Sequence, residues 1–92
     1  MRHLLNDLAA CVDDGEIERA AYYFADLREA VERAMRDAPV PRVDGAITQS
    51  LSGLQLALHR GDARRASYAL RQVAYLLDQH ARAECAQPMR TD

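Results

Sequence analysis

The side chains in this chain that are able to bind a metal ion are two cysteines and three histidines: Cys11, Cys85, His3, His59 and His80. Thiolate and imidazole groups are common ligands of zinc and other transition metals. In an antiparallel helical bundle, Cys11 and His59 would lie at one end and the other three at the opposite end. His80 and Cys85 are five residues apart on one helix, about 140° around its axis, so they do not share a face. We therefore predict no metal site and no cofactor, and we interpret Cys11 as a buried apolar residue.

The sequence also lacks the usual patterns of enzymes. It contains no His-Glu-x-x-His, no Glu-x-x-His, no glycine-rich phosphate loop and no Cys-x-x-Cys. All 12 basic residues are arginine, which excludes lysine nucleophiles and Schiff bases. The hydroxyl residues between Thr48 and Ser67 do not stand beside a histidine or an acid at a suitable spacing. We predict that the protein is not an enzyme.

The chain contains an internal repeat. The second half of the chain repeats the first at an offset of 46 residues, the separation of Gly15 from Gly61. Apolar, small and aromatic residues recur together at this offset. Leu5, Leu8, Val12, Gly15, Arg19, Ala20 and Tyr22 correspond to Leu51, Leu54, Leu58, Gly61, Arg65, Ala66 and Tyr68. Two copies of one helical hairpin are the simplest explanation.

Apolar residues recur at steps of three and four, which is helical periodicity. It predicts helices over about 3–13, 16–37, 42 or 44–60, and 62–85. Gly15 and Gly61 end two of them, and Pro39 and Pro41 hold the central connection extended. We predict one all-α domain over 1–92, a four-helix bundle built from two antiparallel hairpins. The hairpins cover about 3–38 and 42–85, and a frayed tail follows at 86–92.

A small set of residues resembles the turn and second helix of a tetratricopeptide repeat: Gly15, Ile17, Ala20, Phe24 and Leu27. The second copy has the same spacing at Gly61, Ala66, Leu70 and Val73. The resemblance implies a protein-binding scaffold. The family has a period of about 34 residues, shorter than the period here, and a small residue where this chain has Leu8 and Leu54. These departures favour a closed bundle over the open superhelix of the family.

The charges around the two glycine turns differ in sign. Asp13, Asp14 and Glu18 correspond to His59, Arg60 and Arg64. One interpretation is that the two turns attract each other within one chain, at the modest energy of exposed ion pairs. The other is that a basic turn, formed by Arg60, Arg64 and Arg65, binds an acidic protein partner. Nucleic acid is the weaker form of this second interpretation, because no basic recognition helix or interleaved aromatic residues are present.

Tyrosines are predicted on the outer side of the second and fourth helices. Tyr22 and Tyr68 are repeat equivalents that stand about 160° around the helix from Phe24 and Leu70, and Tyr75 follows on the same face as Tyr68. They either pack between the hairpins or lie singly on the surface, or they anchor a protein interface, where tyrosine is enriched.

The unequal lengths of the predicted helices suggest a homodimer. The first helix would extend about 16 Å and the last about 36 Å, which leaves part of the bundle without its fourth wall. Val31, Met35 and Leu76 belong to this level of the bundle. We expect a second copy to cover it, mainly through the second and fourth helices, with Tyr75 near the edge. The alternative is a bundle that holds a metal ion or a small apolar molecule.

Length and charge set the remaining limits. The chain has 92 residues and a net charge of −2, so it has no general attraction for nucleic acid or anionic lipid. No apolar run approaches the roughly 18 residues that a membrane span requires, and we expect a cytoplasmic protein without a membrane partner. The sequence therefore predicts a small helical module for protein–protein interaction.

Overall fold

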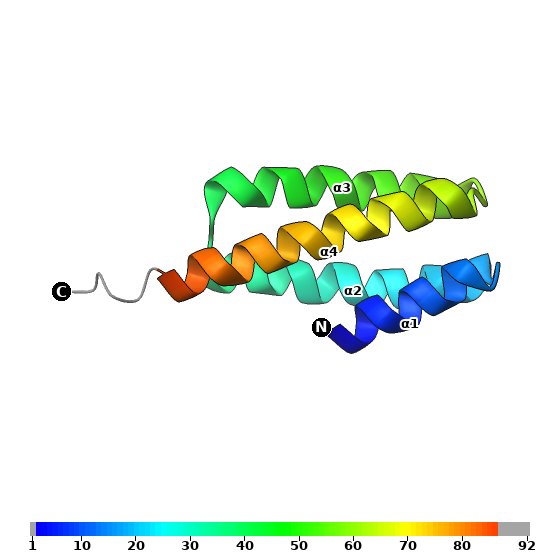
Figure 1. Ribbon diagram of the computed structural model, residues 1–92, viewed down its shortest axis with the longest axis horizontal. Coiled ribbons are helices and arrows are strands. Elements are labelled where there is room, and N and C mark those ends of the chain that lie inside the picture. The colour runs from blue at the N-terminus through cyan, green and yellow to red at the C-terminus, as the bar shows by residue number, and fades with distance from the viewer. Residues whose placement is uncertain (1, 87–92) are drawn as a thin grey trace.

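The computed structural model describes residues 2–86, with side chains through Ala83, and it confirms an all-α fold of four helices. They are α1 (Arg2–Asp13), α2 (Ile17–Asp37), α3 (Pro41–His59) and α4 (Ala63–Ala86), shown in Figure 1. No strand occurs in this range. The predicted tail begins one residue too early, because Ala86 ends α4; residues 87–92 lie outside the described residues.

The turns within the two hairpins have the same backbone structure. Gly15 and Gly61 have positive φ angles of 78° and 69°, which favour glycine because it has no Cβ. In the first turn the amides of Gly15 and Glu16 donate to the carbonyls of Val12 and Cys11, at 3.1 and 2.8 Å. The residues at the 46-residue offset form the same two hydrogen bonds, at 3.1 and 2.9 Å. The duplication is therefore present in the backbone as well as in the sequence.

The connection between the hairpins is shorter than predicted, because Pro41 is the first residue of α3. Proline suits this position because the first amides of a helix have no partner within it. Ala38 and Val40 are extended, with φ angles of −143° and −131°. The Val40 amide, which precedes the helix, donates to Oδ2 of Asp44 at 3.0 Å. This side chain therefore fixes the start of α3.

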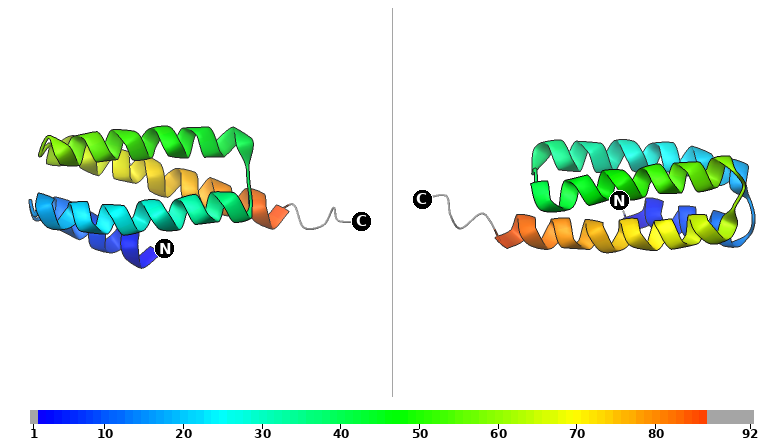
Figure 2. Two further views of the ribbon diagram at one scale, coloured as in Figure 1. Left: turned by 180° about the vertical axis from the view of Figure 1, so that it is seen from behind. Right: turned by 90° about the horizontal axis from the view of Figure 1, so that it is seen from above.

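The helices form a closed four-helix bundle. Close packing joins α1 to α2, α2 to α3, α3 to α4 and α1 to α4, so α2 and α4 occupy diagonally opposite corners, as Figure 2 shows. The apolar faces meet in one core, whose largest fully buried side chains are Leu8, Leu27, Ile47, Leu54, Val31 and Val73. Ala20 and Ala66 are also fully buried, one in each hairpin.

The first helix covers only part of the length of its neighbours. It has 12 residues, against 21 in α2 and 24 in α4. Beside its N-terminal end lies a groove of about 550 Å³, which we call the α1–α4 groove. It is lined by Arg2, Leu5, Asn6, Ala34, Ala74, Leu77, Asp78, His80 and Ala81.

Candidate interaction surface

The five cysteine and histidine residues considered as metal ligands lie in different places. His3 and His59 are exposed, whereas Cys11 is buried in the core, as interpreted from the sequence. His80 is buried near the connection between α2 and α3, and the side chain of Cys85 lies outside the described residues. Over the described part of the chain, no three His, Cys, Asp or Glu side chains come together as a metal site would require.

His80 forms a polar contact that the sequence did not reveal. Its Nε2 lies 2.7 Å from the carbonyl oxygen of Ala38, and since a carbonyl can only accept, Nε2–H is the donor. The same nitrogen lies 3.8 Å from Oδ1 of Asp44, whose other oxygen caps α3. The histidine therefore ties α4 to the connection between the hairpins. The only signal in the sequence is that position 80 continues the apolar stripe of Val73 and Leu77.

The two glycine turns do not form an ion pair with each other among the described residues. Each turn is instead paired locally: Arg19 contacts Glu16 at 3.3 Å, and Arg65 contacts Asp62 at 3.4 Å. The hydrogen bond with Glu16 raises the pKa of Arg19. Asp13 does line the same hollow of about 500 Å³ as Arg64, without reaching it. Direct pairing between the turns therefore does not hold the hairpins together.

Charge is divided unequally between the hairpins. Aspartate and glutamate outnumber arginine by nine to five in residues 1–38, whereas arginine outnumbers the acids by six to four in residues 42–86. Ion pairs within each hairpin use equal numbers of acids and arginines, so each excess remains. In the described residues, Glu18 and Asp26 on α2 and Arg64 and Arg71 on α4 are exposed and have no ion-pair partner. Each hairpin therefore carries uncompensated charge of its own sign.

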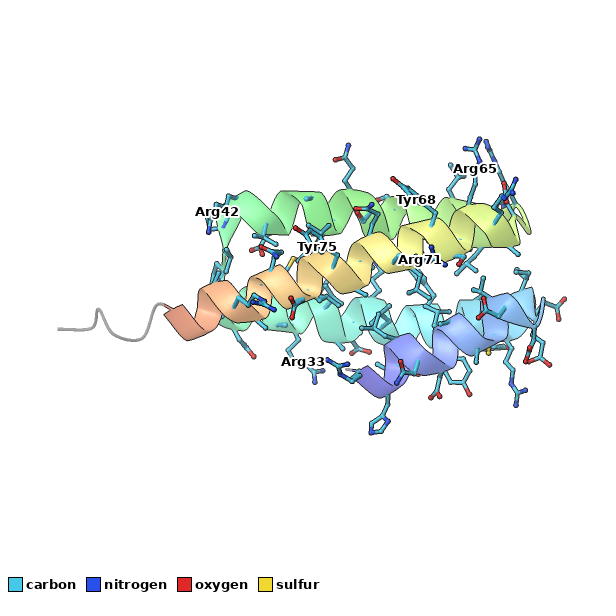
Figure 3. All side chains as sticks on the ribbon, in the orientation of Figure 1. Arg33, Arg42, Arg65, Tyr68, Arg71 and Tyr75 are labelled. Carbon is cyan, nitrogen blue, oxygen red and sulfur yellow. The ribbon has the colours of Figure 1, made fainter. Side chains whose placement is uncertain are left out.

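The three predicted interface tyrosines are exposed. Tyr22, Tyr68 and Tyr75 have exposed fractions of 78, 67 and 62%, so the interpretation that they pack between the hairpins is wrong. Tyr68 and Tyr75 project from α4 near Arg71, as Figure 3 shows. The hydroxyl of Tyr68 accepts a weak hydrogen bond from Gln72 at 3.4 Å. Two large side chains with apolar rings therefore stand on the outside of one helix.

A shallow hollow adjoins this row of side chains, between α3 and α4. Its volume is about 590 Å³, and its lining residues are Ser50, Gly53, Arg64, Arg65, Tyr68, Ala69 and Gln72. Nothing lies within 4 Å of the position of a Cβ on Gly53, so the floor of the hollow is open at this point. The hollow thus combines small residues with a tyrosine and two arginines of the basic turn.

Two of the three aliphatic residues predicted at the interface keep some exposure. Met35 and Leu76 are half-buried, but Val31 is fully buried inside the chain itself. The prediction for Val31 is therefore wrong. Ile47 at the same level is also fully buried, so one chain already closes this part of the core without a second copy.

No protein family, curated protein or solved structure gives a significant match to this chain. In the described part of the chain, none of the helices has the length and apolar character needed to cross a membrane. The evidence for function is therefore the surface of the bundle. On this surface, exposed aromatic rings stand beside arginines without an ion-pair partner, next to a shallow hollow.

Proposed function

We propose that this protein is a small helical module for protein–protein interaction and that it associates with itself. The proposal rests on the outer face of α4, where Tyr68 and Tyr75 are exposed beside unpaired Arg64 and Arg71. Tyrosine and arginine are enriched among the residues that dominate binding energy at interfaces. A tyrosine ring gains from leaving water while its hydroxyl still finds a polar partner.

The other surface features agree with this function. The basic turn adds positive charge next to the tyrosines, which suits an acidic protein surface better than a neutral one. The resemblance of each hairpin to a tetratricopeptide repeat also favours a binding role, although the period differs. The cytoplasmic location expected from the sequence belongs to the same proposal, and cell fractionation would test it.

Sedimentation equilibrium of the purified protein tests self-association. We expect a mass above the 10.3 kDa of one chain at tens of micromolar, falling towards that value on dilution. Replacing both Tyr68 and Tyr75 by alanine should weaken association, while the control Leu56→Ala, an exposed apolar residue on α3, should not. A single species of 10.3 kDa at every concentration would contradict the proposal.

The α1–α4 groove favours a second candidate function, the binding of a small apolar molecule. Leu5, Ala74 and Leu77 supply apolar walls to a space of about 550 Å³, within the range of small-molecule sites. Mass spectrometry of an organic extract of the purified protein tests this. A bound molecule in a one-to-one ratio would support the second function. If the protein carrying that molecule is also a monomer, ligand binding would replace self-association as the proposed function.

A further inference from the structure

We infer that the outer face of α4 on one copy binds the outer face of α2 on a second copy, head to tail. The inference rests on the proposed self-association and names the two surfaces that carry it. The α4 outer face consists of Arg64, Tyr68, Arg71, Gln72 and Tyr75. The α2 outer face consists of Glu18, Tyr22, Ala25, Asp26 and Glu29, which occupy the same repeat positions.

The two faces carry opposite charge around equivalent tyrosines. Each centres on an exposed tyrosine, Tyr22 or Tyr68. On α2 the unpaired Glu18 and Asp26 are four residues before and four after Tyr22. On α4 the unpaired Arg64 and Arg71 are four residues before and three after Tyr68. At 1.5 Å per residue, these charges lie about 4.5 to 6 Å from the tyrosine along both helices. The acids and arginines therefore match in register whether the two helices run parallel or antiparallel.

Each tyrosine also has a hollow to enter on the opposite face. Beside the α2 outer face, between α2 and α3, lies a hollow of about 410 Å³. It is lined by Ala21, Phe24, Ala25, Arg28, Glu29, Glu32, Gln55, Leu58 and His59. Tyr68 would enter this space over the two alanines, while Tyr22 would enter the hollow above Gly53 and Ala69 beside α4. Ring burial then adds to charge attraction, which alone gives little at a surface.

The positions of the helices determine the symmetry of this contact. The helix α4 lies on the viewer's side of the bundle in Figure 1, and α2 lies on the viewer's side after the rotation by 180° in the left view of Figure 2, so their exposed faces are on opposite sides of the bundle. Because the two faces point in opposite directions, two copies cannot join both pairs around one twofold axis. The contact is heterologous, and it gives a dimer first and then a longer chain or a ring.

Two blocked variants test the inference. The first, Glu18→Arg with Asp26→Arg, makes the α2 outer face basic; the second, Tyr68→Ala with Tyr75→Ala, removes the anchors of the α4 outer face. All four side chains are exposed. Each variant alone should associate at least about tenfold more weakly than the wild type in sedimentation velocity. Asp7→Arg with Asp37→Arg, an equal charge change on exposed residues away from both faces, should behave as the wild type.

An equimolar mixture of the two blocked variants is the decisive sample. The intact α4 outer face of the Glu18→Arg, Asp26→Arg variant can bind the intact α2 outer face of the Tyr68→Ala, Tyr75→Ala variant. The other two faces cannot bind each other, because one is now basic and the other has lost its tyrosines. We expect a one-to-one dimer of wild-type affinity and no larger species. If the wild type associates and the blocked variants associate equally well, the inference is wrong. The inference is also wrong if the wild type associates and the mixture stays monomeric. In both cases the proposed self-association still stands. A wild type that is monomeric at every concentration would overturn the proposed function as well.

Discussion

The two hairpins of this protein have the same interior and different exteriors. Their turns form equivalent hydrogen bonds around Gly15 and Gly61, and their buried residues correspond one to one at several positions. These pairs are Leu8 and Leu54, Val12 and Leu58, Ala20 and Ala66, Phe24 and Leu70, and Leu27 and Val73. On the surface, Glu18 in the first hairpin corresponds to Arg64 in the second, and Asp26 corresponds to Gln72. Packing therefore restricts the residue types at core positions, whereas exposed positions tolerate a change of charge.

The largest expected effect comes from truncating equivalent core leucines. Leu8→Ala and Leu54→Ala each remove a fully buried side chain and leave a cavity, which costs about 2–5 kcal/mol. If the hairpins contribute equally to one core, urea denaturation should give similar losses for both variants. Leu56→Ala, at a position 49% exposed, is the control and should lose far less. A loss at Leu8 no greater than this control would show that the short first helix is not part of the common core.

His80 is a position at which the two interiors differ, because its repeat equivalent is the half-buried Ala34. His80→Phe should destabilise the fold by about 1–3 kcal/mol, since the Ala38 carbonyl loses its donor. For a domain of this size, about 1 kcal/mol lowers the melting temperature by roughly 4–8 °C. The same substitution at the exposed His59 is the control and should leave the melting temperature nearly unchanged. Equal melting temperatures for the two variants would mean that the His80 contact does not stabilise the protein.

The glycine turns should respond alike. Gly15→Ala and Gly61→Ala each force a side chain into a left-handed conformation, which costs about 1 kcal/mol although no atom blocks the added Cβ. Gly45→Ala, inside α3 and equally open, should instead stabilise by about 0.5–1 kcal/mol. Thermal melts should therefore shift in opposite directions. If the melting temperature falls for only one of the two turn variants, the two turns are not equivalent.

Much of the fold was predictable because helical periodicity and turn glycines act locally. The 46-residue offset identified both hairpins and the pairs that pack in the core. Pro41 was misplaced because a proline favours both an extended connection and the first position of a helix. Val31 was misassigned because helix length alone does not reveal how closely three helices pack where the fourth is missing. The contact of His80 with Ala38 joins residues distant in sequence, and no local pattern marks it.

The candidate surface was predictable in part. The outward direction of Tyr22 and Tyr68 follows from helix geometry, and their exposure agrees with it. The sequence alone left two interpretations of the charged turns, because pairing within the chain depends on distances across the bundle. Only the structure shows that α2, with Glu18 and Asp26, and α4, with Arg64 and Arg71, occupy diagonally opposite corners of the bundle.

A dilution series of the ¹⁵N-labelled protein, followed by two-dimensional amide NMR spectra, tests directly whether the two outer faces bind each other. Head-to-tail association places both outer faces in an interface at high concentration. The amides around Tyr22 on α2 and around Tyr68 on α4 should therefore shift together on dilution, while those around Gly45 stay fixed. Spectra that do not change with concentration, or changes confined to the α1–α4 groove, would contradict the claim that the two outer faces bind each other.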